Sequence, residues 1–94
     1  MLRIKDVTAL DGFRLRLTLT DGSVIERDVS ALLKGPVFEP ITEDPARFRQ
    51  VLVEGGSVAW ESGGDLCPDM LIWGGPPPVD AATAVVPRHL TLRA

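Results

Sequence analysis

The clearest pattern of hydrophobic and polar positions lies between residues 13 and 19, where apolar and polar side chains alternate strictly. A period of two indicates a β-strand that buries one face and exposes the other. We predict an antiparallel strand with Phe13, Leu15, Leu17 and Leu19 in the core and with Arg14, Arg16 and Thr18 towards water.

Two neighbouring strands are predicted at residues 3–9 and 24–28. The turn at Asp11-Gly12 connects the first of them to residues 13–19, and the turn at Asp21-Gly22 connects the second. Together the three segments form an antiparallel unit.

The register of the second pair depends on the length of its loop. A two-residue loop places Arg16 opposite Arg27. We prefer a three-residue loop with Gly22 in the left-handed conformation, and we expect it to place Arg16 opposite Asp28.

A second hairpin is predicted around Gly55-Gly56, because a Gly-Gly pair supplies the positive φ angles of a two-residue type I′ turn. This loop pairs Glu54 with Ser57 and, further along, Val51 with Trp60. One face of the hairpin should therefore enter the core, and it carries Val51, Val53, Val58 and Trp60.

Three short helices are predicted from the positions of capping residues and prolines. Ser30 offers a capping hydroxyl to the first, Asp44-Pro45 offers a cap and a first-turn proline to the second, and Pro68 fits the first turn of the third. The connection around Phe38 and Ile41, which prolines interrupt, is expected to be irregular. The helices are predicted at residues 28–34, 45–49 and 68–73.

These elements predict an α+β fold. We expect an antiparallel β-sheet of about five strands, built from two hairpin units, with two or three short helices packed on one face. The whole should form a single domain over residues 1–75.

The composition changes at Gly74, where Gly-Gly-Pro-Pro-Pro begins a stiff, extended spacer. Residues 76–94 are therefore predicted to be a spacer and tail. Because the tail is apolar, we expect it to add a strand to a sheet edge of a second subunit in a homodimer; docking on its own chain is the alternative. The predicted interaction surface comprises Trp73, Val85, Val86, Leu90 and Leu92.

Composition limits the cellular compartments and the classes of partner that we expect. The net charge of −3 is too small to favour nucleic acid or a membrane surface as a partner. Cys67 is the single cysteine, which excludes an internal disulfide and fits a reducing compartment. Because the sequence shows neither a signal peptide nor a membrane span, we expect a cytoplasmic protein.

Few residues are candidates for chemistry. His89 is the single histidine and has no second ligand at metal-binding spacing, so we predict no metal site. Cys67 is either a reactive thiol near a helix start or a buried small hydrophobe, and we expect the second because no base partner is evident. No catalytic residue and no cofactor are predicted.

Four carboxylates lie close together in the sequence, namely Glu54, Glu61, Asp65 and Asp69. Paired carboxylates serve in acid–base hydrolysis or hold hard metal ions. However, Glu54 and Glu61 fall on the face opposite the buried one, Asp65 fits a turn and Asp69 fits a helix end. We interpret all four as structural or solvated.

Aromatic and basic residues offer two more candidates. Trp60 is expected in the core, whereas Trp73 is either a core residue or an exposed contact residue. Arg14, Arg16 and Arg27 are either a phosphate-binding set or a solvated sheet face. We expect the solvated face, because no aromatic partner accompanies them.

The order of these features resembles one known family. Residues 3–73 contain a hairpin, a strand ending in tryptophan, a glycine-containing turn and a proline-initiated helix. They resemble domain of unknown function family 2442, a bacterial α+β domain found alone, fused to a helix-turn-helix, or encoded beside another small protein as toxin–antitoxin pairs are. The resemblance implies no catalytic residues. Its motif residues are Asp21, Gly22, Trp60, Asp65, Leu66, Pro68 and Leu71.

The sequence therefore predicts function mainly by elimination. We expect a non-enzymatic protein–protein interaction module whose partner is a protein, a second copy included. A nucleic-acid-linked regulator, as an antitoxin-like or transcription-associated component, is the alternative implied by the resemblance. As a partner by direct contact, nucleic acid is not expected. A small-ligand-binding protein or enzyme is the third hypothesis, and it requires a concave pocket between the sheet and the helix at residues 68–73.

Overall fold

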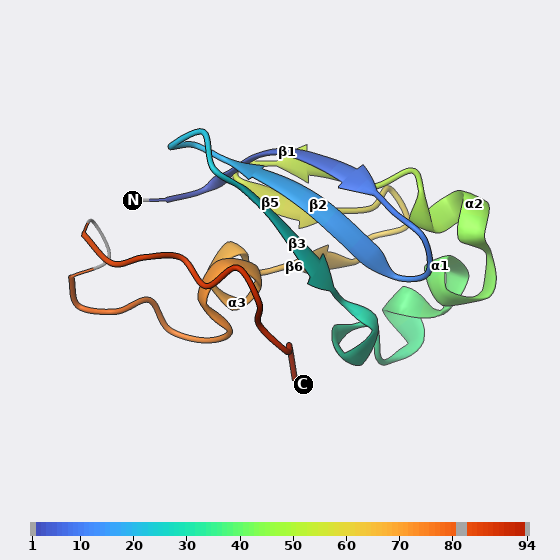
Figure 1. The fold of residues 1–94 in the computed structure, drawn as a ribbon. Coiled ribbons are helices and arrows are strands. Elements are labelled where there is room, and N and C mark those ends of the chain that lie inside the picture. The colour runs from blue at the N-terminus through green and yellow to red at the C-terminus, as the bar shows by residue number, and fades with distance from the viewer. Residues whose placement is uncertain (1, 81–82, 94) are drawn as a thin grey trace.

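The computed structural model describes residues 2–80 and 83–93, and its fold is α+β as predicted. Its described strands form two antiparallel sheets of three strands each, with orders β1-β2-β3 (sheet A) and β4-β5-β6 (sheet B) (Figure 1). The predicted single sheet of five strands is therefore wrong. The strands are β1 (Ile4–Ala9), β2 (Arg14–Leu19), β3 (Val24–Asp28), β4 (Leu52–Glu54), β5 (Ser57–Ala59) and β6 (Asp65–Leu66).

The two sheets meet at β1, which lies beside β4 and β5 without forming a ladder. A backbone hydrogen bond joins them there, from the N–H of Ile4 to the oxygen of Gly56 at 3.3 Å. The two hairpin units are therefore neighbours, but they do not pair along the whole length of a strand as one flat sheet would.

Sheet A confirms the alternation in β2. Leu15, Leu17 and Leu19 are fully buried, and Phe13, just before the strand, is partly buried against the core. Arg14 and Arg16 are exposed on the opposite face.

The register between β2 and β3 differs from the prediction. The loop does have three residues and a left-handed Gly22, with φ of 89°, but it closes between Leu19 and Ser23, whose N–H and oxygen are 2.8 Å apart. As a consequence Arg16 lies opposite Glu26 and not opposite Asp28. The predicted register is therefore shifted by two residues along β3.

Sheet B confirms the Gly55-Gly56 turn, in which both glycines have positive φ angles of 59° and 83°. Glu54 pairs with Ser57, as predicted. The ladder stops before Val51 and Trp60, because the chain turns after Ala59. The N–H of Trp60 then donates to Gly64 and brings the unpredicted β6 back alongside β5.

The helical segments lie in two groups: α1 and α2 at one end of the sheets, and α3 nearer the other (Figure 1). The expectation that they pack together on one face is therefore wrong. Pro36–Phe38 and Glu39–Glu43 are helical where an irregular connection was predicted. The segments are η1 (Ser30–Leu32) and η2 (Pro36–Phe38), both 3-10 helices, and α1 (Glu39–Glu43), α2 (Pro45–Phe48) and α3 (Pro68–Trp73).

The capping predictions are confirmed for α2 and wrong for η1. The Asp44 carboxylate accepts from the N–H of Ala46 at 3.0 Å. At η1 the Ser30 hydroxyl makes no capping bond; the carboxylate of Asp28 accepts from the Ser30 N–H instead, at 2.9 Å.

The core lies between the inner faces of the two sheets and includes Trp60, as predicted. The indole N–H of Trp60 donates to the oxygen of Phe48 at 2.9 Å, and the centroids of the two rings are 5.8 Å apart. In the described part of the chain, no helix is long and apolar enough to cross a membrane.

The tail returns to its own chain. Leu92 is only 4% exposed and is part of the core, and Leu90 packs against Gly74. Within residues 83–93 no strand forms, so Val85-Val86 and Leu90–Leu92 add no strand to a sheet of their own chain. The described tail therefore packs through side chains and not through a ladder.

Candidate functional site

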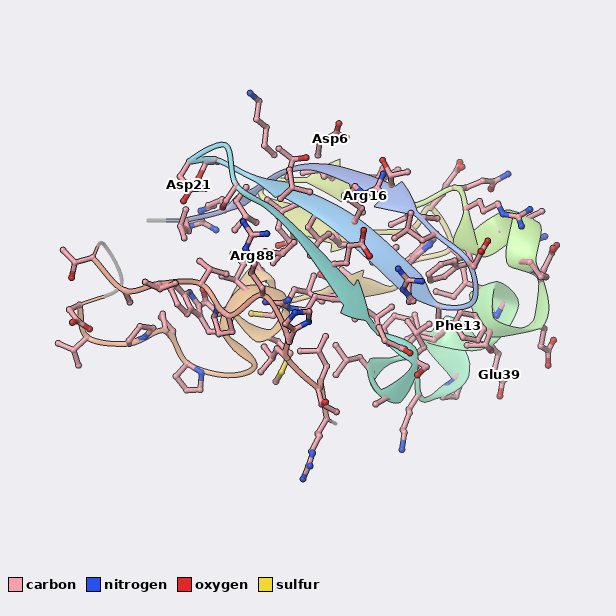
Figure 2. All side chains as sticks on the ribbon, viewed as in Figure 1. Asp6, Phe13, Arg16, Asp21, Glu39 and Arg88 are labelled. Atoms are coloured by element: carbon pink, nitrogen blue, oxygen red, sulfur yellow. The ribbon has the colours of Figure 1, made fainter. Side chains whose placement is uncertain are left out.

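The outer face of sheet A carries paired charges. Arg14 and Arg16 both donate to the carboxylate of Glu26, at 2.6 and 3.3 Å. The hydrogen bond from Arg14 holds the pKa of Glu26 below its usual value. Asp6 and Arg16 project from this face (Figure 2), which is a solvated sheet face, as expected for Arg14 and Arg16.

Arg27 does not belong to that face. It is 1% exposed and points into the core, which corrects the prediction that it is solvated. Its Nε–H donates to the oxygen of Leu71 at 2.8 Å. The carbonyl oxygens that accept from its guanidinium are those of Glu26, Leu71, Ile72, Pro87 and Arg88.

This buried guanidinium therefore connects β3, the end of α3 and the tail. Leu71 and Ile72 lie in the last turn of α3, where free carbonyl oxygens carry partial negative charge. Burial lowers the pKa of Arg27. Its donors are occupied by the fold, which argues against a phosphate-binding role for Arg14, Arg16 and Arg27 as a set.

The outer face of sheet B is different, because its carboxylates are exposed and Leu52 on it is 40% exposed. Leu52, Ala59 and Asp65 stand in one row across the three strands. Glu54 and Ser57 form the next row. Val53, Val58 and Leu66, which alternate with these residues, belong to the core cluster or pack against it.

A shallow groove of about 650 Å³ lies on this outer face. Three exposed carboxylates line it, and no Lys or Arg is among its described lining residues. None of the three forms an ion pair with another described residue. The residues of the groove are Leu52, Glu54, Ser57, Ala59, Trp60, Glu61, Gly63, Gly64 and Asp65.

Packing beneath the groove fixes the turn that carries Glu61. The ring of Phe38 lies so close to Gly64 that a Cβ atom there would be 2.6 Å from the ring atom Cε1. The same ring meets Trp60 edge to face, with centroids 6.3 Å apart. Only glycine fits at position 64 without displacing the ring, so the turn rests directly on the aromatic core.

A second groove, of about 430 Å³, lies on another side of Trp60 and is lined by Ile41, Asp44, Arg47 and Glu61 among others. Asp44 and Arg47 are 3.8 Å apart in an exposed ion pair. This groove therefore presents both signs of charge, unlike the groove on sheet B.

Core side chains lie between sheet A and α3. Leu71, Ile72 and Arg27 are all buried there. They occupy part of the space in which the ligand-binding hypothesis requires a pocket.

The remaining candidate residues lie apart from one another. His89 is exposed, beside β3, and Cys67 is exposed at the start of α3. The prediction that Cys67 is buried is wrong, because its position as N-cap turns the side chain outward. No group of three His, Cys, Asp or Glu side chains suited to a metal ion occurs among residues 2–80 and 83–93.

The four carboxylates of the middle region separate into two sets. Glu54, Glu61 and Asp65 are exposed and share the groove on sheet B. Asp69 lies in the first turn of α3, as predicted for a helix end. Asp65 lies in a strand, not in the predicted turn, and this difference brings it into line with Leu52.

The predicted tail surface is mostly occupied within the chain. Trp73, Val86 and Leu90 pack partly buried against the core, and Leu92 is buried in it. Val85 is 89% exposed and is the member of this set that remains available.

Arg27 is the residue that the sequence analysis misjudged most. Its position alternates with Val24, Glu26 and Asp28 and has the same parity as Ile25 and Val29, which are both buried. That alternation was the pattern that placed it on the inner face of β3.

Comparison with known proteins places the chain in a family. No protein of curated function matches it. It is 41% identical to the "Putative DNA Binding Protein NE0471" of Nitrosomonas europaea ATCC 19718, whose crystal structure it matches with a TM-score of 0.58. The match covers 65% of this chain and 41% of that protein, so the chain spans less than half of the neighbour's length. Residues 4–77 match the family model described as "Protein of unknown function (DUF2442)", and the chain therefore belongs to this family.

Proposed function

We propose that this protein is a non-enzymatic protein-binding module whose recognition surface is the outer face of sheet B. One observation carries the proposal: an open groove of about 650 Å³ on this face is lined by an exposed leucine and by three carboxylates that form no ion pair with any residue the structure describes. Open, shallow surfaces with apolar and charged residues suit a macromolecule better than an enclosed small ligand.

Charge favours protein over nucleic acid as the partner at this surface. Nucleic acids are recognised through contacts of Lys and Arg with phosphates. Glu54, Glu61 and Asp65 would repel phosphates, and Arg14 and Arg16 on sheet A already share the carboxylate of Glu26.

The experiment is capture of partners from the native host with the full chain as bait, followed by mass spectrometry. Each captured protein is then purified, and its binding to the full chain is measured by calorimetry. A purified partner that binds with one defined stoichiometry supports the proposal. Failure of every purified candidate to bind overturns it.

A second candidate function, a component of a DNA-linked regulator, is favoured by the name of the Nitrosomonas europaea neighbour. Because this chain covers 41% of that protein, DNA contact there can belong to the remaining part. The two candidates separate in a fluorescence anisotropy titration with duplex DNA at 50 and 200 mM salt. We expect no saturable binding by this chain; tight binding that weakens steeply with salt would favour the second candidate.

A further inference from the structure

We infer that the outer face of sheet B binds a basic polypeptide segment in which Lys or Arg side chains flank an apolar one. This inference rests on the proposed function and names the chemistry of its partner.

The spacing is set by the register of sheet B. Leu52, 40% exposed, and Glu54 are two residues apart on the same face of β4. Alternate residues of a strand are about 6.7 Å apart, and strands are about 4.8 Å apart. Asp65, two strands from Leu52 in the same row, is therefore about 10 Å away from it. An apolar side chain seated on Leu52 thus has a carboxylate on two sides, each within reach of a Lys or Arg.

The charge is set by the absence of internal partners. On sheet A the carboxylate of Glu26 has two guanidinium groups within 3.3 Å. By contrast, Glu54, Glu61 and Asp65 line one groove and form no ion pair within the described ranges, residues 2–80 and 83–93. Clustered carboxylates without counter-charges attract a cationic partner and repel an anionic one.

The floor of the groove supplies the apolar contact. Ala59 lies directly opposite Leu52 and, like Trp60, is almost fully buried, so Leu52 is the apolar side chain of the groove that a partner can cover. The turn beside it rests on the Phe38–Trp60 pair and on the close contact of Phe38 with Gly64. An apolar side chain with carboxylates around it is an arrangement suited to binding a short segment of a partner protein.

The test is a titration of the full, isotope-labelled chain with three synthetic peptides, followed by nuclear magnetic resonance. The first peptide is Gly-Arg-Ser-Leu-Ser-Arg-Gly, the second replaces both arginines with glutamate, and the third replaces leucine with serine. We expect shifts of the amide signals of residues 52–65 with the first peptide and not with the second, and weaker binding of the third. Equal binding of the first two peptides, or no shifts with the first, would overturn the inference.

Variants then locate the binding. The triple variant E54Q/E61Q/D65N should bind the first peptide about tenfold more weakly at low salt, the size of loss expected when three exposed ion pairs are removed. The matched control D11N/E39Q/E43Q removes three exposed carboxylates outside the groove, and its affinity should stay within about twofold of the original. An equal loss in both variants would show attraction to net charge alone and would contradict the inference.

The same variants separate this inference from the proposed function. If a purified natural partner binds E54Q/E61Q/D65N as tightly as the unaltered chain, the chain is a protein-binding module, but the inference that its groove on sheet B binds a basic segment is wrong. If no purified partner binds either protein, the proposed function itself fails.

Discussion

Arg27 places a positive charge in the core with five carbonyl oxygens as acceptors and no carboxylate within ion-pair distance among the described residues. Removing a buried charge from water is costly unless each donor finds an acceptor. Arg27 meets this condition by bonding to backbone groups that the ends of α3 and the tail leave free. The side chain therefore decides where both segments lie.

We predict that Arg27→Met lowers the free energy of unfolding by about 2–4 kcal/mol, because buried carbonyl oxygens lose their donors. Arg27→Lys should also be destabilising, because one ammonium group cannot reach acceptors that a planar guanidinium bonds at several nitrogens. Urea unfolding measures both. Arg14→Met, which alters an exposed arginine in the same sheet, is the control and should change stability little; an equal loss in both Met variants would contradict the prediction.

The indole of Trp60 packs against the ring of Phe48 and also donates a buried hydrogen bond to the oxygen of the same residue. Trp60→Ala should cost about 3–5 kcal/mol of unfolding free energy, the usual range for removing a large buried aromatic side chain. Trp60→Phe keeps most of the apolar contact but leaves the oxygen of Phe48 without its donor, so a loss of about 1–3 kcal/mol is expected. A loss below about 1 kcal/mol for Trp60→Ala in urea unfolding would argue against a central packing role.

At the scale of elements, the hairpin of β2 and β3 depends on ionised carboxylates. Asp21 accepts from the N–H of Ser23 at 2.9 Å and from its hydroxyl, Glu26 binds Arg14, and Asp28 accepts from the N–H of Ser30. These hydrogen bonds lower the pKa of all three carboxyl groups below their ordinary values of 3.8 for Asp and 4.5 for Glu.

A group whose pKa is lower in the folded state binds protons more readily in the unfolded state, so its stabilising effect is present above the ordinary pKa and is lost as the pH falls. We therefore predict that the free energy of unfolding declines as the pH is lowered below about 4.5, through the ordinary pKa values and towards the lowered ones. Urea unfolding at a series of pH values measures this decline. The combined variant D21N/E26Q should show a shallower decline; an unchanged slope would show that other carboxyl groups are responsible.

Local turn chemistry explains which elements could be predicted. At Gly55-Gly56 the two-residue loop fixes the register of sheet B, and that prediction is confirmed. At Asp21-Gly22 the length of the loop was predicted, but its closing pair, Leu19 and Ser23, was not. The alternation in β2 continues up to Leu19, so it does not mark where the loop closes. The strand β6 has two residues and no periodicity of its own, and it forms only because β5 lies beside it.

The candidate surface was predictable only in part, for the same reason. Alternation along the hairpin places Glu54 on the exposed face, as expected. The grouping of Glu54 with Asp65 depends on β6 and could not be read from local pattern. Long-range packing likewise placed Leu92 inside, since its position is not specified by its neighbours in the sequence.

At the scale of the whole molecule, the tail, drawn in red, runs back across α3 and lies beside β3 (Figure 1). Deleting residues 86–94 should lower the free energy of unfolding, because Leu92 leaves the core and Arg27 loses the oxygens of Pro87 and Arg88. Urea unfolding of the shortened chain measures the loss. A deletion that leaves stability unchanged would show that the tail contributes nothing to the fold.

The predicted homodimer is tested on the same shortened chain by light scattering. The contacts of the tail with Arg27 and Gly74 can be made by the tail of a second copy as well as by its own, since residues 74–79 form a proline-rich connection with an exposed Val79. If the full chain is a dimer held by exchanged tails, removal of residues 86–94 should give a monomer. A full chain that is monomeric at every concentration would contradict the homodimer.

The contact of Arg27 with the tail also bears on how the tail can vary in sequence. Arg27 bonds to the carbonyl oxygens of Pro87 and Arg88, and every amino acid has such an oxygen. These hydrogen bonds therefore do not depend on the identity of either side chain. The identity of the side chain matters instead at Leu92, which is packed in the core. The tail is therefore open to mutational drift at the positions where it is held most directly, and intolerant of change at a position that Arg27 never touches.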